Sequence, residues 1–171
     1  MRQRIVALRA KCEDVTAVRK KLLGIGAKPL DAFCQVDTYF NVPSGEMCLR
    51  VINGGRGFLV YRPDKRAGDA SEVFLAKIEN PSELAALLKA ALGIKCVIHR
   101  VREVYSWEDM RVYIDRISGL GSFVELQAKV GRGVERERVP SLLEAMRKLG
   151  ISETKFVDEP YSDLLRRKDE P

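Results

Sequence analysis

The stretch Asp115–Lys129, DRISGLGSFVELQAK, places the strongest constraint on how this chain can fold. Its first residues predict the end of one strand, and Gly119 and Gly121 predict a tight turn, because glycine adopts positive φ without a Cβ clash. After the turn the side chains alternate with the period of a strand: Phe123, Glu125, Gln127 and Lys129 against Val124, Leu126, Ala128 and Val130. A sheet with one polar and one apolar face can close on itself around a polar interior.

The rest of the chain predicts more strands of the same kind. Alternating or strand-like segments lie at 3–12, 34–42, 46–53, 58–62, 71–78, 95–107 and 110–117, which with 123–130 gives about eight strands. Apolar stripes and caps predict helices at 13–24, 80–93 and 137–149, and a short basic helix near the C-terminus. The polar segment 63–70 predicts a loop. Because turns connect successive strands, the sheet should be mostly antiparallel, within one α+β domain over 1–171.

Composition narrows the partners that such a domain can have. The chain has 171 residues and a formal net charge of +6, which favours an anionic ligand but does not distinguish a phosphate compound from nucleic acid. The aromatic residues occur singly in predicted strands, which argues against a nucleic-acid surface. Four scattered cysteines and one histidine form no zinc pattern. No signal peptide or membrane-spanning run is visible, so we expect a cytoplasmic protein without a membrane partner.

Five motifs occur in one order along the chain: DTYF at 37–40, LR at 49–50, RVREVY at 100–105, D-x-x-x-GLG-x-FVEL at 115–126 and YSDLL at 161–165. Together they resemble the CYTH superfamily, the triphosphate tunnel metalloenzymes. YSDLL and the segment YRPD at 61–64 are most similar to the class IV adenylyl cyclase (CyaB-like) group. The resemblance implies an eight-stranded antiparallel closed β-barrel, or tunnel, with helices packed outside and a polar lumen that binds a triphosphate. Members make cyclic AMP or hydrolyse inorganic or thiamine triphosphate with a divalent metal.

The arginines are the candidate phosphate-binding residues. Arginine presents a planar fork of donors that matches phosphate oxygens, and several forks in one lumen would bind a polyphosphate. The resemblance assigns Arg9, Arg50, Arg62, Arg100 and Arg102 to lumen positions where the family carries phosphate-binding Lys or Arg. The alternative for each arginine is a solvated strand residue.

The first strand departs from the family pattern. The family motif E-x-E-x-K matches Ile5, Ala7 and Arg9 here, so both carboxylates are absent. On the third predicted strand a second basic position is also lost, because Ile52 occupies it.

The last strand retains part of the family's metal ligands. Its E-x-E motif matches Glu125 and Gln127, and Asp115 is the other acid available. Hard divalent cations need several carboxylate oxygens, so Asp115 and Glu125 would hold Mg²⁺ or Mn²⁺ only weakly, with help from the substrate's phosphates. The alternative is that Glu125 pairs with an arginine in the lumen.

The resulting prediction is a protein that binds a triphosphate or nucleotide in a basic lumen, with catalysis weakened or lost. One alternative is a class IV-type adenylyl cyclase or a triphosphatase that uses divalent metal. Another is a non-enzymatic scaffold or a nucleic-acid-associated protein. The pattern leaves catalytic residues, preferred ligand and oligomeric state open.

Overall fold

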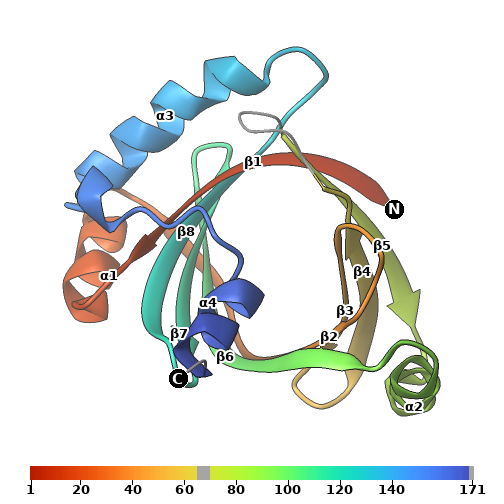
Figure 1. The fold of residues 1–171 in the computed structure, drawn as a ribbon. Coiled ribbons are helices and arrows are strands. Elements are labelled where there is room, and N and C mark those ends of the chain that lie inside the picture. The colour runs from red at the N-terminus through yellow and green to blue at the C-terminus, as the bar shows by residue number, and fades with distance from the viewer. Residues whose placement is uncertain (65–69, 170–171) are drawn as a thin grey trace.

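The computed structural model describes residues 1–64 and 70–169, and its strands close into one antiparallel barrel (Figure 1). The hydrogen-bonded order round the wall is β1-β5-β4-β3-β2-β6-β7-β8, and β8 pairs back with β1. The strands are β1 (Arg2–Lys11), β2 (Lys28–Phe40), β3 (Glu46–Ile52), β4 (Arg56–Arg62), β5 (Ser71–Ile78), β6 (Ile94–Trp107), β7 (Met110–Ile117) and β8 (Gly121–Lys129). The predicted closed antiparallel barrel of eight strands is confirmed.

The described residues also contain four α-helices, which lie outside the wall or at one side of a barrel opening (Figure 1). They are α1 (Val15–Gly24), α2 (Pro81–Leu92), α3 (Glu135–Lys148) and α4 (Tyr161–Asp169). The predicted α+β class is confirmed. None of these helices is long and apolar enough to cross a membrane. The loop predicted at 63–70 falls mostly on residues 65–69, which lie outside the described residues.

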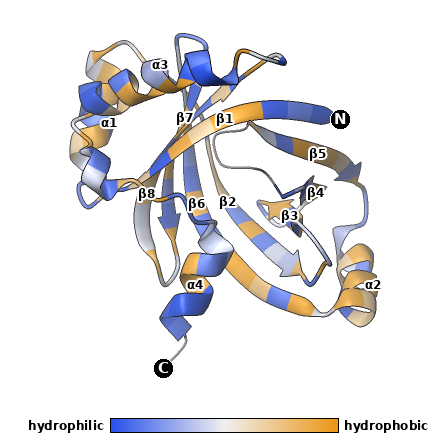
Figure 2. Cartoon of the chain, turned by 45° about the horizontal axis from the view of Figure 1, so that its top comes forward, coloured by the Kyte–Doolittle hydropathy of each residue, from blue (hydrophilic) through white to orange (hydrophobic). Residues whose placement is uncertain are grey.

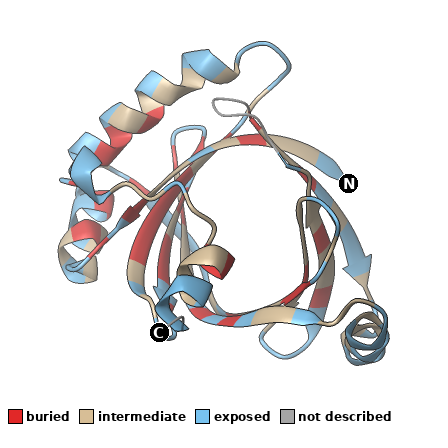
Figure 3. Cartoon of the chain, in the orientation of Figure 1, coloured by how far each residue is buried: buried red, intermediate tan, exposed pale blue. Residues whose placement is uncertain are grey.

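The main apolar core lies between the outer wall and the helices α1 and α3. Apolar side chains of the wall pack against both helices, and five of the most central have no exposed area: Leu22 of α1, Leu142 and Met146 of α3, Val112 of β7 and Leu126 of β8. Figure 3 shows buried segments of α3 and β8 facing each other. Full burial of such a side chain contributes about 1.5–3 kcal/mol, so this half of the wall anchors the barrel. Helix α2 lies against the opposite side, near β2, β3 and β4.

The alternation of side chains decides what faces the lumen. Along the strands, hydrophilic and hydrophobic residues alternate, as the blue and orange bands of β2 and β6 show (Figure 2). Ala10 of β1 and Cys12, the residue after the strand, enter the outer core, whereas Ile5 packs inside the barrel, as the pattern of residues 3–12 predicts. The pairing register sets Arg9 directly opposite Glu125 on β8. Charged residues of neighbouring strands therefore meet inside the barrel.

Strand β2 begins earlier than the sequence predicts. It starts at Lys28 instead of residue 34, because a register shift between Pro29 and Asp31 interrupts the alternation that marks a strand. Residues 28–34 pair with β6 alone, since the ladder to β3 starts only at Gln35. This part of β2 therefore has one edge without a strand partner.

Two amide groups in the part of β2 that pairs with β6 alone have acceptors outside the strand ladders. The Asp31 carboxylate accepts the backbone N–H of Ala32 at 2.9 Å. Cys34 donates its N–H to the Asn53 side-chain oxygen at 3.0 Å and accepts the Asn53 N–H at 2.9 Å. Pro29 has no N–H to offer. Side chains thus take the place of the missing neighbour strand.

Candidate anion-binding lumen

All five arginines that the resemblance assigns to the lumen occupy lumen-facing positions: Arg9 on β1, Arg50 on β3, Arg62 on β4, and Arg100 and Arg102 on β6. The two on β6 are only 6% and 7% exposed. Four of the five bond to buried carboxylates, and Arg62 makes no ion pair with any residue of the described chain. The phosphate-binding role of the five remains a prediction, whereas their gathering in one layer is a feature of the structure.

Asp37 is the acid at the centre of this layer, and the sequence reasoning missed it. Arg50 holds both its carboxylate oxygens in a fork, at 2.9 and 3.0 Å, and Arg100 donates to it at 2.5 Å. Gln35 adds a fourth bond, at 2.9 Å. Burial opposes ionisation of Asp37, but Arg50 and Arg100 outweigh it and hold its pKa well below the ordinary value. The available sequence signal was strand alternation, because Asp37 is odd-numbered and odd-numbered residues share one face of β2. The pairing register sets Asp37 opposite Arg50 on β3.

Asp115 holds the second fork. Arg102 donates to its two oxygens at 2.7 and 2.6 Å, and the nearest nitrogen of Arg100 lies 3.5 Å away. The Tyr161 hydroxyl donates to the same carboxylate at 3.2 Å. Asp115 has no exposed area, and all of its neighbours named here are donors. Its oxygens are therefore engaged by the protein itself.

Glu125 is paired with Arg9. Two nitrogens of Arg9 lie 2.9 Å from the same oxygen of Glu125, and the side chain of Gln127 donates to the other oxygen. Burial opposes ionisation, but Arg9 and then Arg102 outweigh it and lower the pKa of Glu125 to about 2. This is the arrangement that the sequence left open as the alternative to metal ligation.

Tyr161, the first residue of α4, enters the lumen from one end of the barrel. Its ring meets Phe123 edge-on, with centroids 5.0 Å apart, and lies under the guanidinium of Arg9 at 4.0 Å. It belongs to an apolar cluster on the inner wall that includes Ile117 and Ile98. Figure 1 shows α4 at one side of the barrel opening. On that side the charged layer therefore meets an aromatic and apolar cluster.

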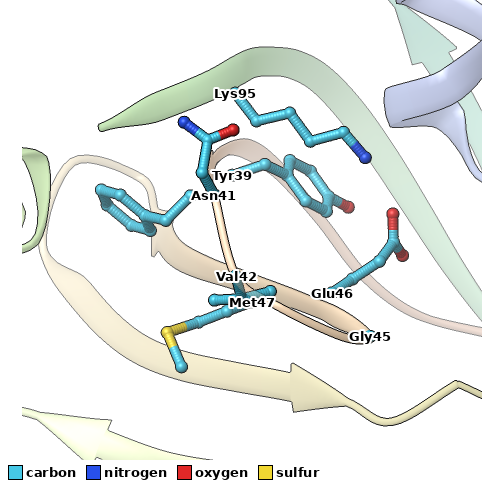
Figure 4. A pocket seen from close by; sticks show the side chains of 8 residues that line it. Tyr39, Asn41, Val42, Gly45, Glu46, Met47 and Lys95 are labelled. Atoms are coloured by element: carbon cyan, nitrogen blue, oxygen red, sulfur yellow. The ribbon is translucent and has the colours of Figure 1, made fainter. Parts of the chain in front are cut away.

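A small cavity lies at the rim near α4 (Figure 4). It has a volume of about 170 Å³, and Tyr39, Asn41, Glu46 and Lys95 contribute polar side chains to it. Two bonds tie α4 to this rim: Ser162 donates to Glu46 at 2.6 Å, and Lys95 donates to Asp163 at 3.2 Å. The cavity is thus a pocket of the barrel rim, next to the two bonds that hold α4.

The lumen carboxylates do not fit a metal held by the protein. Asp37, Asp115 and Glu125 each give their oxygens to arginine forks or donors, and a cation would have to displace them. Across residues 1–64 and 70–169, no three His, Cys, Asp or Glu side chains gather as a metal site. Hard cations need several free carboxylate oxygens. The expectation that Asp115 and Glu125 ligate Mg²⁺ or Mn²⁺ thus receives no geometric support.

The Glu125–Arg9 pair predicts a specific acid response. The pKa of Glu125 is lowered from 4.5 to about 2, so its stabilisation is complete above pH 4.5 and is lost as the pH falls towards 2. In that window the unfolded chain binds the extra proton, so the free energy of unfolding should fall by up to about 1.4 kcal/mol per pH unit. We expect Glu125→Gln to flatten the slope by about that amount in urea denaturation series. Glu13→Gln, at a side chain 87% exposed, is the control; equal slopes in Glu125→Gln and the wild type would contradict the pairing.

Comparison with known proteins places these features in a family. The sequence matches the CYTH domain family over residues 6–161. A Methanocaldococcus jannaschii protein named "putative adenylate cyclase" is 29% identical over 170 residues, covering 93% of this chain and 97% of that protein. A Pyrococcus horikoshii protein has the same fold, with a TM-score of 0.85 at 19% identity over 94% of this chain and 99% of its own.

A second solved structure carries a description of activity. It is a Hippeastrum protein described as a "putative adenylyl cyclase" with a dominant triphosphatase activity, with a TM-score of 0.67 and 18% identity over 96% of this chain and 95% of its own. At that identity the likeness establishes the fold alone. The match over residues 6–161, in contrast, spans most of the sequence and includes seven of the eight strands whole and the second half of β1. The chain therefore belongs to the CYTH domain family.

Proposed function

We propose that this protein binds a triphosphate-bearing anion or a nucleotide in its lumen, with phosphoryl-transfer catalysis weakened or lost. The observation that supports binding is the layer of five lumen-facing arginines, two of them buried. Guanidinium forks that converge in a low-dielectric space favour phosphate oxygens. Weakened catalysis is supported by the engagement of every buried lumen carboxylate by arginine, because two-metal phosphoryl transfer needs free carboxylate ligands.

A second candidate is an active enzyme of the adenylyl cyclase or triphosphatase kind. The names of the Methanocaldococcus jannaschii and Hippeastrum proteins favour it. In this chain, such an enzyme would need the substrate to bring the metal ion, because the carboxylates of the barrel wall are already paired with arginines. A scaffold or nucleic-acid role remains a third candidate, favoured only by the net charge of +6.

Binding without turnover is the expected result. Tripolyphosphate at ten times its Kd should raise Tm by about 3–6 °C, whether EDTA or Mg²⁺ is present, because the arginines and not a metal make the contacts. Arg62→Ala should remove most of this shift at little structural cost, since Arg62 has no carboxylate partner in the described chain. Arg116→Ala, at an exposed position on the outer face of β7, is the matched control.

The same samples decide between the candidates. ATP or tripolyphosphate with Mg²⁺ or Mn²⁺ should yield neither cyclic AMP nor phosphate at ordinary enzyme rates of about 1–10³ s⁻¹. Turnover in that range, abolished by Glu125→Gln, would establish the enzyme and end the proposal of lost catalysis. Binding of a nucleic-acid duplex that tripolyphosphate does not compete away would favour the third candidate.

A further inference from the structure

The rim pocket, the cavity of about 170 Å³ near α4, contains a buried hydroxyl without a partner among the described residues. Tyr39 lines this pocket and is only 5% exposed, yet its hydroxyl makes no hydrogen bond within residues 1–64 and 70–169. Burial raises the pKa of Tyr39 well above its usual range, so the hydroxyl keeps its proton and can donate. Buried polar groups in native proteins nearly always have a partner. The hydroxyl is therefore free to bond to a group that enters the pocket.

Two opposite charges line the same pocket but do not pair with each other. Lys95 and Glu46 both belong to its wall, and no nitrogen of Lys95 lies within the 4.0 Å of Glu46 that defines an ion pair. Lys95 bonds instead to Asp163, at 3.2 Å, which uses one of its three donors. Glu46 accepts from Ser162 at 2.6 Å through one of its two oxygens. Both groups thus keep bonding capacity for a ligand that lies between them.

A glycine fixes the wall of the pocket on the side of Glu46. Gly45 has a φ of +70°, and a Cβ at this position would overlap the carbonyl oxygen of Arg62. Only glycine therefore lets the loop before β3 approach β4 so closely. Glu46 is the next residue, so this close approach sets the position of its backbone. A preformed wall of this kind loses less entropy when a ligand binds.

The size of the pocket limits its ligand to a small molecule. A cavity of about 150 Å³ holds benzene, so the rim pocket has room for a ligand of about six non-hydrogen atoms. Figure 4 shows the ammonium of Lys95, the hydroxyl of Tyr39 and the carboxylate of Glu46 on one side of the pocket. The Asn41 side chain donates to the Leu92 carbonyl oxygen at 3.3 Å, which leaves its own oxygen as an acceptor. The wall therefore offers donors and acceptors together.

We propose that the rim pocket binds a small zwitterion, an α-amino acid with a short side chain. The ligand carboxylate would accept bonds from Lys95 and the Tyr39 hydroxyl, and the ligand ammonium would donate to Glu46 and to the Asn41 oxygen. One cation and one anion on the wall suit a ligand without net charge better than a phosphate anion. Val42 adds an apolar contact for the short side chain. None of the five lumen arginines lines this pocket, so the inference does not rest on the proposed function.

Calorimetric titration at pH 7.5 tests the chemistry of the ligand. The probes are L-alanine, glycine, acetate, methylammonium and L-tryptophan. We expect L-alanine and glycine to bind at least tenfold more tightly than acetate or methylammonium, because each of these supplies only one of the two charges. L-tryptophan exceeds the size of the pocket and should bind at least tenfold more weakly than L-alanine. The proposal is overturned if L-alanine does not bind, or binds no more tightly than acetate, methylammonium or L-tryptophan.

Tyr39→Phe tests the pocket itself, because it removes one oxygen and keeps the ring. L-alanine affinity should fall at least fivefold, whereas Tm of the free protein should not fall, since the hydroxyl has no bond to lose. A purely structural role of the hydroxyl predicts the opposite pattern, a lower Tm with unchanged L-alanine affinity.

Lys95→Met removes the cation of the pocket and should weaken L-alanine at least tenfold. Lys89→Met, at an exposed position of α2 outside the pocket, is the matched control and should leave L-alanine affinity unchanged. Circular dichroism checks that each variant folds, and Lys95→Met decides if Tyr39→Phe does not fold. L-alanine affinity equal to that of the wild type in a folded pocket variant would overturn the proposal.

Discussion

Replacing Arg102 with methionine should destabilise the folded protein by about 3–5 kcal/mol, the cost of removing one partner of a buried ion pair. Arg102 holds both oxygens of Asp115 at 2.7 and 2.6 Å, and Asp115 has no exposed area. Methionine fills similar space but offers no donor, so the carboxylate keeps only Tyr161 and the long contact to Arg100. Urea denaturation at pH 7 measures the loss as a lower midpoint at constant slope.

A double-mutant cycle separates the contribution of the ion pair to stability from the contribution of side-chain packing. Asp115→Asn added to Arg102→Met removes the uncompensated charge, so the double variant should be more stable than Arg102→Met alone. Arg138→Met is the matched control, because Arg138 pairs with Asp109 at 2.8 Å where the carboxylate is 68% exposed, and such a surface pair is worth about 0–1 kcal/mol. Equal losses for Arg102→Met and Arg138→Met would mean that the fork in the lumen adds nothing to stability.

The double variant Ala7→Glu with Gln127→Glu should gain a divalent-cation site that the described residues of the native chain do not form. Ala7 and Gln127 face each other directly on β1 and β8, and Glu125 lies on the same face. Three carboxylates would then surround one space, and Ala7 is at a family position that carries glutamate. We expect Mn²⁺ binding with a Kd on the order of 10⁻⁴–10⁻³ M, the range of weak carboxylate sites. Calorimetry measures it, and Mn²⁺ should raise Tm of the variant alone.

A second pair of facing residues, outside the lumen, is the control for this Mn²⁺ site. Thr38 and Val97 also face each other, on β2 and β6, but point outwards. Thr38→Glu with Val97→Glu therefore places two carboxylates at the same separation without a third, and should bind Mn²⁺ far more weakly. Comparable Mn²⁺ affinity in the two double variants would show that paired carboxylates on any strand suffice. No Mn²⁺ binding by Ala7→Glu with Gln127→Glu would show that Arg9 keeps Glu125 unavailable.

The sequence predicted most of the barrel because the strand period is local information. Residues 123–129 alternate in sequence, and Phe123, Glu125 and Gln127 all face the lumen in the structure. The early start of β2 was missed for the converse reason: a register shift next to Pro29 destroys the alternation over residues 28–33. Only the long ladder to β6 makes that segment a strand, and a ladder is a tertiary feature.

The sequence predicts which arginines lie in the candidate site, but it does not predict which acid each of them pairs with. The alternation of side chains along the strands places all five arginines on the lumen face, as expected. Which acid each arginine meets depends on the register between distant strands: Arg9 and Glu125 are 116 residues apart, and Arg100 and Asp37 are 63 apart. Asp37 was quoted in the DTYF motif, yet nothing local to it indicates two guanidinium partners. How far the arginine charges in the lumen are neutralised therefore depends on how distant strands pair in the closed sheet.

The occupied edge of β2 bears on how this protein behaves at high concentration. A bare strand edge is a template for strands of other molecules, and is a common origin of domain swapping and amyloid-like growth. The amides of Ala32 and Cys34 already have acceptors, and Pro29 supplies none. An incoming chain would find the donors of both residues already engaged. This edge of one of the longest strands is therefore a weaker template for fibril growth than a bare edge would be.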